Sequence, residues 1–278
     1  MAFDIRAIRH PKERIHGNAT LVAGAALWAL FWFELVGEED PLVAILALSS
    51  ICLLLWGFSA AGNALTRAYM FGNYVLVGPE QFPHIDRMVK EGAQRLGMSE
   101  APLTFVYNSS GVINAMALRL IGKGRYIWLT SALIDTDNEE QLRFVIGHEL
   151  GHHVAGHLDT LPYILRWPVF AVPFLGAAYS RGRELTCDRI GAFLVQDMEI
   201  SRSALQVLAC GSAKLNSQMN AAAFAAQEKL VPPIAGFFVK AMSGYPSLTK
   251  RVEEVARWLE GQSHLLEEIK QGQSLTSG

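Results

Sequence analysis

Two long apolar runs follow each other closely in the first quarter of the chain. Residues 19–36 and 42–61 each approach the ~20 residues with which an α-helix crosses the ~30 Å hydrocarbon core of a bilayer. The short acidic connector 37–40 separates them, which favours a hairpin of two spanning helices over a cleavable signal segment. The alternative interpretation of this pattern is a helical hairpin buried in a protein core.

The spacing of apolar positions changes after Pro79. Residues 80–96 repeat apolar side chains at helical intervals and stop at Gly97. Later segments rich in β-branched and aromatic residues predict short strands, at 103–107, 112–118 and 125–130. Further helices are expected over 139–157, 203–230 and 246–266. The pattern therefore predicts an α+β fold, mainly α, in which a small β-sheet lies beside a helix.

These elements divide the chain into four parts. We expect a basic segment 1–18, a transmembrane hairpin anchor 19–66, a folded domain 67–266 and a disordered polar tail 267–278. Within the domain, residues 158–179 are mostly apolar but are interrupted by three prolines and an arginine. That segment is long enough for one membrane crossing and too short for two.

Composition and charge narrow the class of protein. The chain is 51% hydrophobic and 18% charged, which is apolar for a soluble protein of 278 residues. A formal net charge of −2 gives no basic surface for nucleic acid, and three scattered cysteines do not indicate a disulfide framework. Basic residues precede the first apolar run and are absent from the connector 37–40, so both termini are expected in the cytoplasm.

A short motif of the form His-Glu-x-x-His carries the candidate chemistry. On a helix, His148 and His152 lie one turn apart on the same face, a spacing that suits two ligands of one metal ion. Catalytic zinc sites use three protein ligands and leave a fourth position for water. Glu149 points about 100° around the helix and is predicted to be the general base. Asp137, with Glu140 three residues later, predicts the cap of this helix. A buried helix carrying the motif by chance is the alternative.

The third ligand decides the class of zinc site. A metzincin would need a histidine at position 158, where this chain has leucine. The segment 180–188 instead offers Glu184, and a distant glutamate as third ligand fits a gluzincin. Asp188 is the candidate carboxylate that holds the second ring nitrogen of a ligand histidine. A single membrane crossing by residues 158–179 would separate Glu184 from the histidines, so we predict that this segment is a membrane-facing insert.

Four short patterns of the domain resemble a known family. They are Asn114-Ala115-Met116-Ala117, His148 to His152, the Ser180 to Asp188 pattern Ser-Arg-x-x-Glu-x-x-Cys-Asp, and Tyr245-Pro246-x-x-x-x-Arg251. The resemblance is to the integral-membrane zinc endopeptidases that include the HtpX heat-shock proteases and the CAAX prenyl endopeptidases. It covers about residues 82–252 and implies a gluzincin-type metalloprotease domain behind a transmembrane helical hairpin. The chain departs from the family at Tyr245, where the family pattern usually has histidine.

The resemblance implies further site residues. Tyr245 and Arg251 would stabilise the oxyanion that forms during hydrolysis, since a phenol also donates a hydrogen bond. Asn114, Ala115 and Met116 would lie on an edge strand that holds the substrate backbone extended. The alternatives are a solvated Arg251, a Tyr-Pro pair that only opens a helix, and a strand with a structural role alone.

The motifs and the resemblance together imply a zinc metalloendopeptidase with one Zn²⁺ per chain. The expected partners are polypeptide substrates and the lipid bilayer, without nucleic acid, and the expected location is the inner membrane with the catalytic domain facing the cytoplasm. HtpX-like quality control of membrane or misfolded proteins is favoured, because the sequence has no further clear spans that would enclose a chamber. A CAAX-type prenyl-peptide processing protease and a non-cleaving zinc-binding membrane adaptor are the alternatives.

Overall fold

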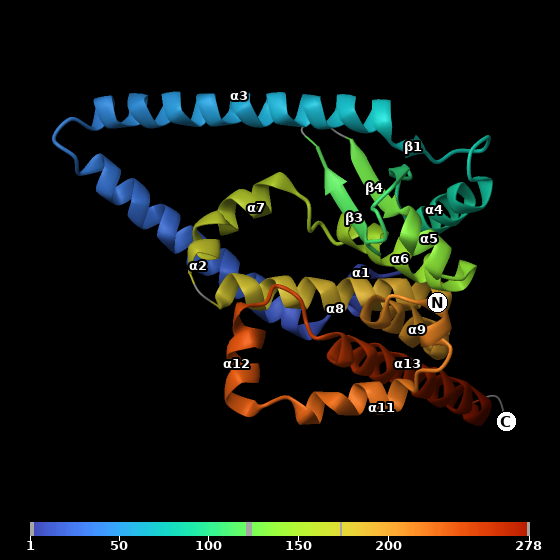
Figure 1. Ribbon diagram of the computed structural model, residues 1–278. Coiled ribbons are helices and arrows are strands. Elements are labelled where there is room, and N and C mark those ends of the chain that lie inside the picture. Colours follow the sequence, from blue (N-terminus) through green and yellow to red (C-terminus); the bar gives the residue numbers. More distant parts are fainter. Residues whose placement is uncertain (1–2, 121–123, 173, 277–278) are drawn as a thin grey trace.

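Two long helices form a V that points away from the rest of the molecule (Figure 1). The computed structural model describes residues 3–120, 124–172 and 174–276, so the ends of the expected basic segment and of the expected tail lie outside the described residues. The helices are α2 (Pro11–Val36) and α3 (Pro41–Asn73), and both are long and apolar enough to cross a membrane. They extend beyond the apolar runs 19–36 and 42–61, because helical hydrogen bonding is local and continues through polar residues.

The first half of α2 packs on the folded domain. Its buried positions include Gly17 and Gly24, and it contacts α7 (Thr160–Arg166) and α8 (Leu175–Val195). A Cβ at Gly24 would lie 2.1 Å from the carbonyl oxygen of Leu165, so glycine is needed for this close approach. The second half of α2 and most of α3 therefore form the exposed part of the hairpin.

The domain contains a small mixed sheet. Its strands are β1 (Val75–Leu76), β2 (Leu103–Tyr107), β3 (Ala115–Arg119) and β4 (Arg125–Thr130). The order is β1-β2-β4-β3, with β2 parallel to β4 and the other neighbours antiparallel. The structure gives β2 and β4 the predicted bounds, starts β3 three residues later than predicted, and adds β1, which is too short to show a periodic pattern. Among the described residues β3 pairs with β4 alone, so β3 forms one edge of the sheet.

Helix α6 (Glu139–Val154) crosses α8 at a pair of glycines. A Cβ at Gly191 would lie 2.6 Å from the backbone oxygen of Phe144, and a Cβ at Gly147 would lie 2.9 Å from the Cα of Gly191. The two backbones are therefore in contact, which leaves no room for side chains at the crossing. This contact sets the spacing between the helix that carries the His-Glu-x-x-His motif and the helix that carries Glu184.

The cap of α6 lies one residue later than predicted. Asn138 accepts a hydrogen bond from the Gln141 amide at 2.9 Å, and the Gln141 side chain accepts one from the Asn138 amide at 2.9 Å. The prediction of Asp137 and Glu140 was wrong, because the same capping-box spacing occurs one residue further on. The Asp137 carboxylate oxygens are buried without a hydrogen-bond partner among the described residues, and burial raises the pKa of Asp137 to about 7.

The remaining helices surround α6 and the sheet. They are α1 (Ile5–Ile8), α4 (Pro83–Arg95), α5 (Ser131–Thr136), the 3₁₀ helix η1 (Trp167–Ala171), α9 (Met198–Cys210), α10 (Ala213–Asn216), α11 (Ala221–Ala226), the 3₁₀ helix η2 (Gln227–Leu230), α12 (Pro233–Met242) and α13 (Leu248–Thr276). Of these, α1, α4, α5, α9, α11 and α13 share a hydrophobic core with α6, α8 and the sheet. The arrangement confirms the predicted α+β, mainly α, fold with a small sheet beside the motif helix.

Two predicted segments differ from the structure. Residues 203–230 form several short helices instead of one, because Gly211 adopts a positive φ of 68° and ends α9. Helix α13 continues to Thr276 and so includes residues 267–276 of the segment that was expected to be a disordered tail. Glu, Leu, Lys and Gln predominate over residues 262–273, and these are good helix formers.

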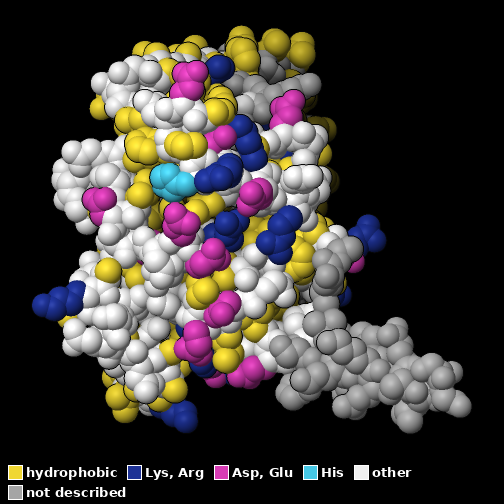
Figure 2. Space-filling view, turned by 90° about the vertical axis from the view of Figure 1, so that its right-hand side faces the viewer, with side chains coloured by type: hydrophobic (Ala, Val, Ile, Leu, Met, Phe, Trp, Pro, Cys, Tyr) yellow, Lys and Arg dark blue, Asp and Glu magenta, His cyan; other side chains and the backbone are white. Residues whose placement is uncertain are grey.

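The surface is divided by polarity. The face turned away from the hairpin tip shows Lys, Arg, Asp and Glu side chains interspersed with hydrophobic ones (Figure 2). Segment 158–179 folds as α7, η1 and the start of α8, packs against α2, and exposes large apolar side chains, among them Leu161, Tyr163, Ile164 and Trp167. Helix α12 also exposes large apolar side chains, among them Ile234, Phe237 and Val239, so the exposed apolar surface is shared by the hairpin, this segment and α12.

Candidate metal centre

Helices α6 and α8 bring three candidate metal ligands together. Nε2 of His148 lies 3.3 Å from one carboxylate oxygen of Glu184, and Nε2 of His152 lies 3.6 Å from the other. His148 and Glu184 are buried, and His152 is partly buried. The two histidines occupy one face of α6 as their spacing predicts, and Glu184 reaches them from α8. All three side chains therefore face one point on the same side of any membrane.

These donors fit a divalent metal ion. Ligand atoms about 2.0–2.1 Å from a tetrahedral zinc ion lie roughly 3.4 Å from one another, and the two observed separations are 3.3 and 3.6 Å. Two imidazoles and one carboxylate also match the donor types of a catalytic zinc site with an open position. The residues present therefore suit zinc in both donor chemistry and spacing.

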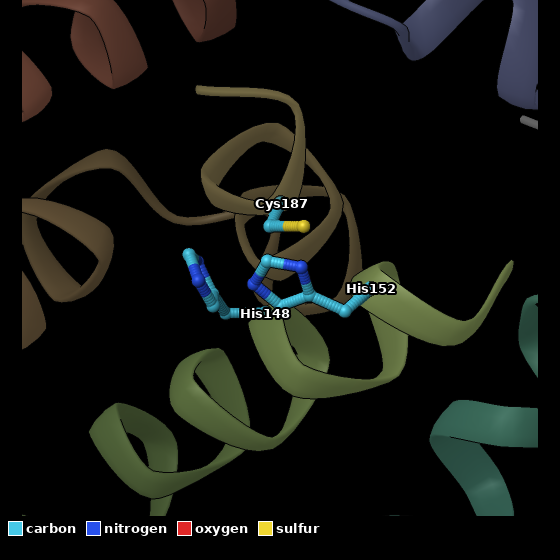
Figure 3. Close-up of side chains that lie close together, drawn as sticks. All are labelled: His148, His152 and Cys187. Carbon is cyan, nitrogen blue, oxygen red and sulfur yellow. The ribbon is translucent and has the colours of Figure 1, made fainter. Parts of the chain in front are cut away.

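A second combination of donors includes Cys187. Its Sγ and one ring nitrogen from each of His148 and His152 lie within 4.8 Å of one another (Figure 3). We favour Glu184 as the third ligand, because its carboxylate addresses Nε2 of both histidines, whereas the Cys187 Sγ lies 3.6 Å from Nδ1 of His157. Burial also raises the pKa of the Cys187 thiol well above its usual value, which keeps it protonated and a poor ligand.

The charges at the centre favour a bound cation. Burial alone would raise the pKa of Glu184, but the hydrogen bond and positive charge of His148 outweigh it and lower that pKa to about 2. Burial and the charge of His148 hold the pKa of His152 well below its usual value, so His152 is neutral and free to donate a lone pair. Burial would lower the pKa of His148, but its hydrogen bonds to Asp188 and Glu184 raise that pKa to about 10. Metal binding at Nε2 of His148 would replace this proton with the ion.

An ion pair stands behind His148. Nδ1 of His148 lies 2.9 Å from Oδ1 of Asp188. The Asp188 carboxylate also accepts two hydrogen bonds from Arg251, from Nη2 to Oδ1 at 2.6 Å and from Nε to Oδ2 at 2.8 Å. Burial opposes the charge on Asp188, but Arg251 lowers its pKa to about 2. The carboxylate therefore stays ionised and orients the His148 ring with Nε2 directed toward Glu184.

Glu149 occupies the floor of a cavity beside these residues. The cavity measures about 290 Å³, and its lining includes His148, His152, Glu184 and Tyr245. The Ala117 amide of β3 hydrogen-bonds the Glu149 carboxylate. Burial raises the pKa of Glu149 to about 7, with the positive charge of His148 opposing the increase. A carboxylate with a pKa near neutrality suits an exchange of protons in either direction.

The residues implied by the family resemblance meet at the same cavity. Asn114, Ala115 and Met116 line one wall together with Ala117, and Tyr245 lies at the mouth with 66% of its surface exposed. The nearby Glu184 charge raises the pKa of the Tyr245 phenol, which keeps it protonated as a donor. Arg251 is 7% exposed and directs two of its nitrogens at Asp188, so it is not a solvated surface residue.

Two residues near the centre were not predicted from the sequence. Nδ1 of His157 lies 3.1 Å from Nδ1 of His152, and Nε2 of His157 lies 3.0 Å from a carboxylate oxygen of Glu13. His157 was considered only as a metzincin ligand out of register, and Glu13 stands in a segment notable for its basic residues. No sequence signal joins the two, because 144 residues separate them.

Comparison with known proteins agrees with this geometry. Residues 79–172 match the family model described as "Peptidase family M48". The chain is 29% identical over 208 residues to the plastoglobule-localized metallopeptidase 48 of Arabidopsis thaliana, covering 67% of this chain and 60% of that protein. It is 31% identical over 221 residues to a protease HtpX homolog of Pyrobaculum calidifontis, covering 69% of this chain and 61% of that protein. The chain thus spans about three fifths of the length of these relatives.

The fold is also similar to a solved structure. The crystal structure of S. mikatae Ste24p superposes with a TM-score of 0.52 over 86% of this chain and 62% of that chain, at 15% sequence identity. The His-Glu-x-x-His motif, the carboxylate of Glu184 and the fold together are typical of a metallopeptidase centre. In this chain an apolar helical hairpin precedes that centre. The match to peptidase family M48 over residues 79–172 and the similarity to an HtpX homolog support the family that the motifs resemble, and the Ste24p structure supports the fold.

Proposed function

We propose that this protein is a membrane-anchored zinc endopeptidase that hydrolyses peptide bonds of membrane or misfolded proteins. The observation that carries the proposal is the convergence of His148, His152 and Glu184, with Glu149 in the cavity beside them. A zinc ion held by these three ligands would supply Lewis acidity that polarises the scissile carbonyl and makes water a stronger acid. Two imidazoles and one carboxylate as donors support zinc as the metal.

Glu149 carries the proton in this proposal. Its carboxylate lies against the cavity and accepts a proton from the attacking water, then passes that proton to the leaving nitrogen. The Ala117 amide holds the carboxylate in place during both steps. Tyr245, at the cavity mouth, is the candidate donor to the oxyanion. Arg251 is assigned to orienting Asp188, because two of its nitrogens already bind that carboxylate.

The edge of β3 is the proposed binding surface for the substrate backbone. The Thr130 amide donates to the Asn114 carbonyl, so residues 114, 116 and 118 face β4 with their backbone groups. The backbone groups of Ala115 and Ala117 consequently point the other way, toward the cavity. A polypeptide that adds to this edge as a strand would be held extended past Glu149.

The hairpin is proposed to span the membrane, with the metal centre on the cytoplasmic side. Contact between Glu13, in the first turn of α2, and His157 supports placing the N-terminal segment up to the start of α2 on the same side of the bilayer as the metal centre. The basic residues of that segment, absent from the connector 37–40, favour the cytoplasm for this side. The apolar residues exposed by α7 and η1 support a membrane-facing position for segment 158–179.

The variant Glu149→Gln tests the proposed function. We expect it to keep one zinc ion per chain, measured by elemental analysis, and to lose cleavage of an unfolded model protein in detergent by at least ~10²-fold, the lower range for a missing acid–base group. The matched control is Glu140→Gln, an exposed carboxylate on the same helix, which should keep wild-type cleavage. Persistent cleavage by Glu149→Gln would refute the assignment, and a wild-type protein that binds zinc without cleaving would be an adaptor.

A further inference from the structure

The residue behind His152 comes from the turn that follows α6. His157 is buried, and its Nδ1 lies 3.1 Å from the Nδ1 of His152. Gly156, with a positive φ of 75°, turns the chain so that the His157 ring folds back onto α6. His157 therefore contacts Nδ1 of His152 in the way that Asp188 contacts Nδ1 of His148.

The direction of these hydrogen bonds follows from the proposed metal site. His152 directs Nε2 toward Glu184, so its remaining proton must reside on Nδ1. That N–H donates to Nδ1 of His157, which leaves the proton of His157 on Nε2. The second N–H then donates to Glu13 across 3.0 Å. Nδ1 of His157, which also lies 3.6 Å from the Cys187 Sγ, is the acceptor in this arrangement, and the chain of donors ends at a carboxylate.

Glu13 is held in place by its neighbours on three sides. Arg9, one turn earlier, pairs with the Glu13 carboxylate and donates from Nη2 to the Ala155 carbonyl at 2.8 Å. The His10 amide donates to Oγ1 of Thr186 on α8 at 3.0 Å. A Cβ at Gly182 would lie 2.7 Å from the backbone nitrogen and Cα of Glu13, so the start of α2 lies directly on α8.

The two ligand histidines thus have related supports. His148 is backed directly by a carboxylate that an arginine holds, Asp188 with Arg251. His152 is backed through a second imidazole by another such pair, Glu13 with Arg9. The first pair comes from α8 and α13, whereas the second comes from the segment that leads into the first membrane-spanning candidate.

We propose that Glu13 and His157 are positioning residues that hold His152 as a metal ligand. The inference rests on the proposed zinc site and deepens it, since the start of α2 becomes a part of the metal centre rather than an anchor alone. The seating of α2 on α8 then sets the affinity of the site for its metal. Movement of the hairpin base away from α8 would remove the acceptor behind His152 and loosen the ion.

The test compares full-length variants in detergent by metal affinity and by spectroscopy. Zinc affinity is measured by competition with a chromophoric chelator, and the visible d–d bands of the Co²⁺-loaded protein report ligand geometry. Loss of an outer hydrogen-bond partner typically weakens metal binding by about 10–100-fold. We expect His157→Leu to weaken zinc binding by about 10–100-fold and to shift the Co²⁺ bands. Glu13→Gln should weaken zinc binding by about 10-fold.

Two further variants separate positioning from general structure. In His157→Asn the amide oxygen can still accept from Nδ1 of His152, so this variant should recover most of the affinity lost in His157→Leu. Glu38→Gln, in the exposed connector, is the matched control for Glu13→Gln and should bind zinc as the wild type does.

The outcomes are distinguishable from a failure of the proposed function. A wild-type protein that binds no zinc would overturn the metal site itself. Wild-type zinc binding together with unchanged affinity and unchanged Co²⁺ bands in His157→Leu and Glu13→Gln would overturn the positioning role alone. Should His157→Leu not fold, the comparison of Glu13→Gln with Glu38→Gln and of His157→Asn with wild type decides the question.

Discussion

Arg251 donates two hydrogen bonds to Asp188, from Nε at 2.8 Å and from Nη2 at 2.6 Å. Both side chains are buried, and the same carboxylate lies 2.9 Å from the Nδ1 of His148. The pair ties α13 to α8 and, through His148, to α6. A contact between residues 63 positions apart in the chain thereby orients one ligand of the proposed metal site.

Breaking this pair from one side should be costly. In Arg251→Met the Asp188 charge stays buried without its partner, which we expect to destabilise the protein by about 3–5 kcal/mol. Adding Asp188→Leu to that variant removes the unpaired charge and should restore part of the stability, but not the zinc affinity, because His148 still lacks its acceptor. Thermal unfolding and chelator competition measure the two effects, and Arg257→Met, exposed on the same helix, is the control. Recovery of zinc affinity in the double variant would contradict the orienting role.

The glycine crossing of α6 and α8 should control metal affinity from a distance. In Gly191→Ala the new Cβ would lie 2.6 Å from the backbone oxygen of Phe144, and a backbone atom cannot move aside as a flexible side chain can. We expect a destabilisation of about 1–3 kcal/mol and weaker zinc binding, because the helices that carry His148 and Glu184 must separate. Gly261→Ala, where the added Cβ meets nothing within 4 Å, is the control. Zinc binding equal to wild type would show that the crossing does not set the ligand spacing.

A proline on the exposed edge of β3 should impair substrate binding selectively. Ala115→Pro removes an N–H on the edge of β3 that faces away from β4 and donates to Oδ1 of Asn114 at 3.0 Å. The hydrogen bonds between β3 and β4 stay intact. We expect kcat/KM for a protein substrate to fall by about 10-fold or more, which corresponds to about 1.4 kcal/mol of lost transition-state binding. Zinc content and thermal stability should stay at wild-type values and serve as controls. Unchanged cleavage would remove the edge of β3 from the proposed binding surface.

Asp137 should make stability depend on pH. The pKa of Asp137 is about 7 in the folded protein, compared with 3.8 when the side chain is not buried, because burial disfavours the charged form. The folded state therefore binds the extra proton between about pH 4 and pH 7, and stability falls as the pH rises through that window. Asp137→Asn carries no charge, so we expect it to be more stable than wild type at pH 8 by about 1–3 kcal/mol and similar at pH 4.

The measurement for Asp137 is thermal unfolding in detergent at pH 4 and pH 8. Asp135→Asn, an exposed carboxylate on α5, is the control and should keep the wild-type difference between the two pH values. A gain from Asp137→Asn that is equal at both pH values would contradict a buried, titrating carboxylate.

Features that depend on neighbours along the chain were predictable. Leu103–Tyr107 and Arg125–Thr130 form the expected strands, and α6 contains the expected histidine pair on one face. The capping error at Asp137 arose because two overlapping sets of polar residues satisfy the same short pattern, and only the folded turn selects Asn138 with Gln141. Strand and helix periods are local properties, so the sequence carries them directly.

Family resemblance extended the prediction across the chain. It joined Glu184 to the histidines over the intervening apolar segment, and the structure brings them within 3.3 and 3.6 Å. It also placed Tyr245 and Arg251 near the candidate metal site. It could not show that Arg251 donates its hydrogen bonds to Asp188. Hydrogen-bond partners of a buried guanidinium depend on which side chains surround it, and no spacing rule encodes them.

The sequence by itself determined the apolar hairpin, the histidine pair and the general architecture, because each follows from periodicity or from residues a few positions apart. Only the tertiary structure decided which side chains support each proposed ligand: Asp188 with Arg251 for His148, and His157 with Glu13 for His152. Those supports come from segments up to 144 residues apart, and packing of helices through glycines brings them together. Residues 9–13, where α2 begins, gave no site signal in the sequence, yet in the fold they lie against the proposed metal centre.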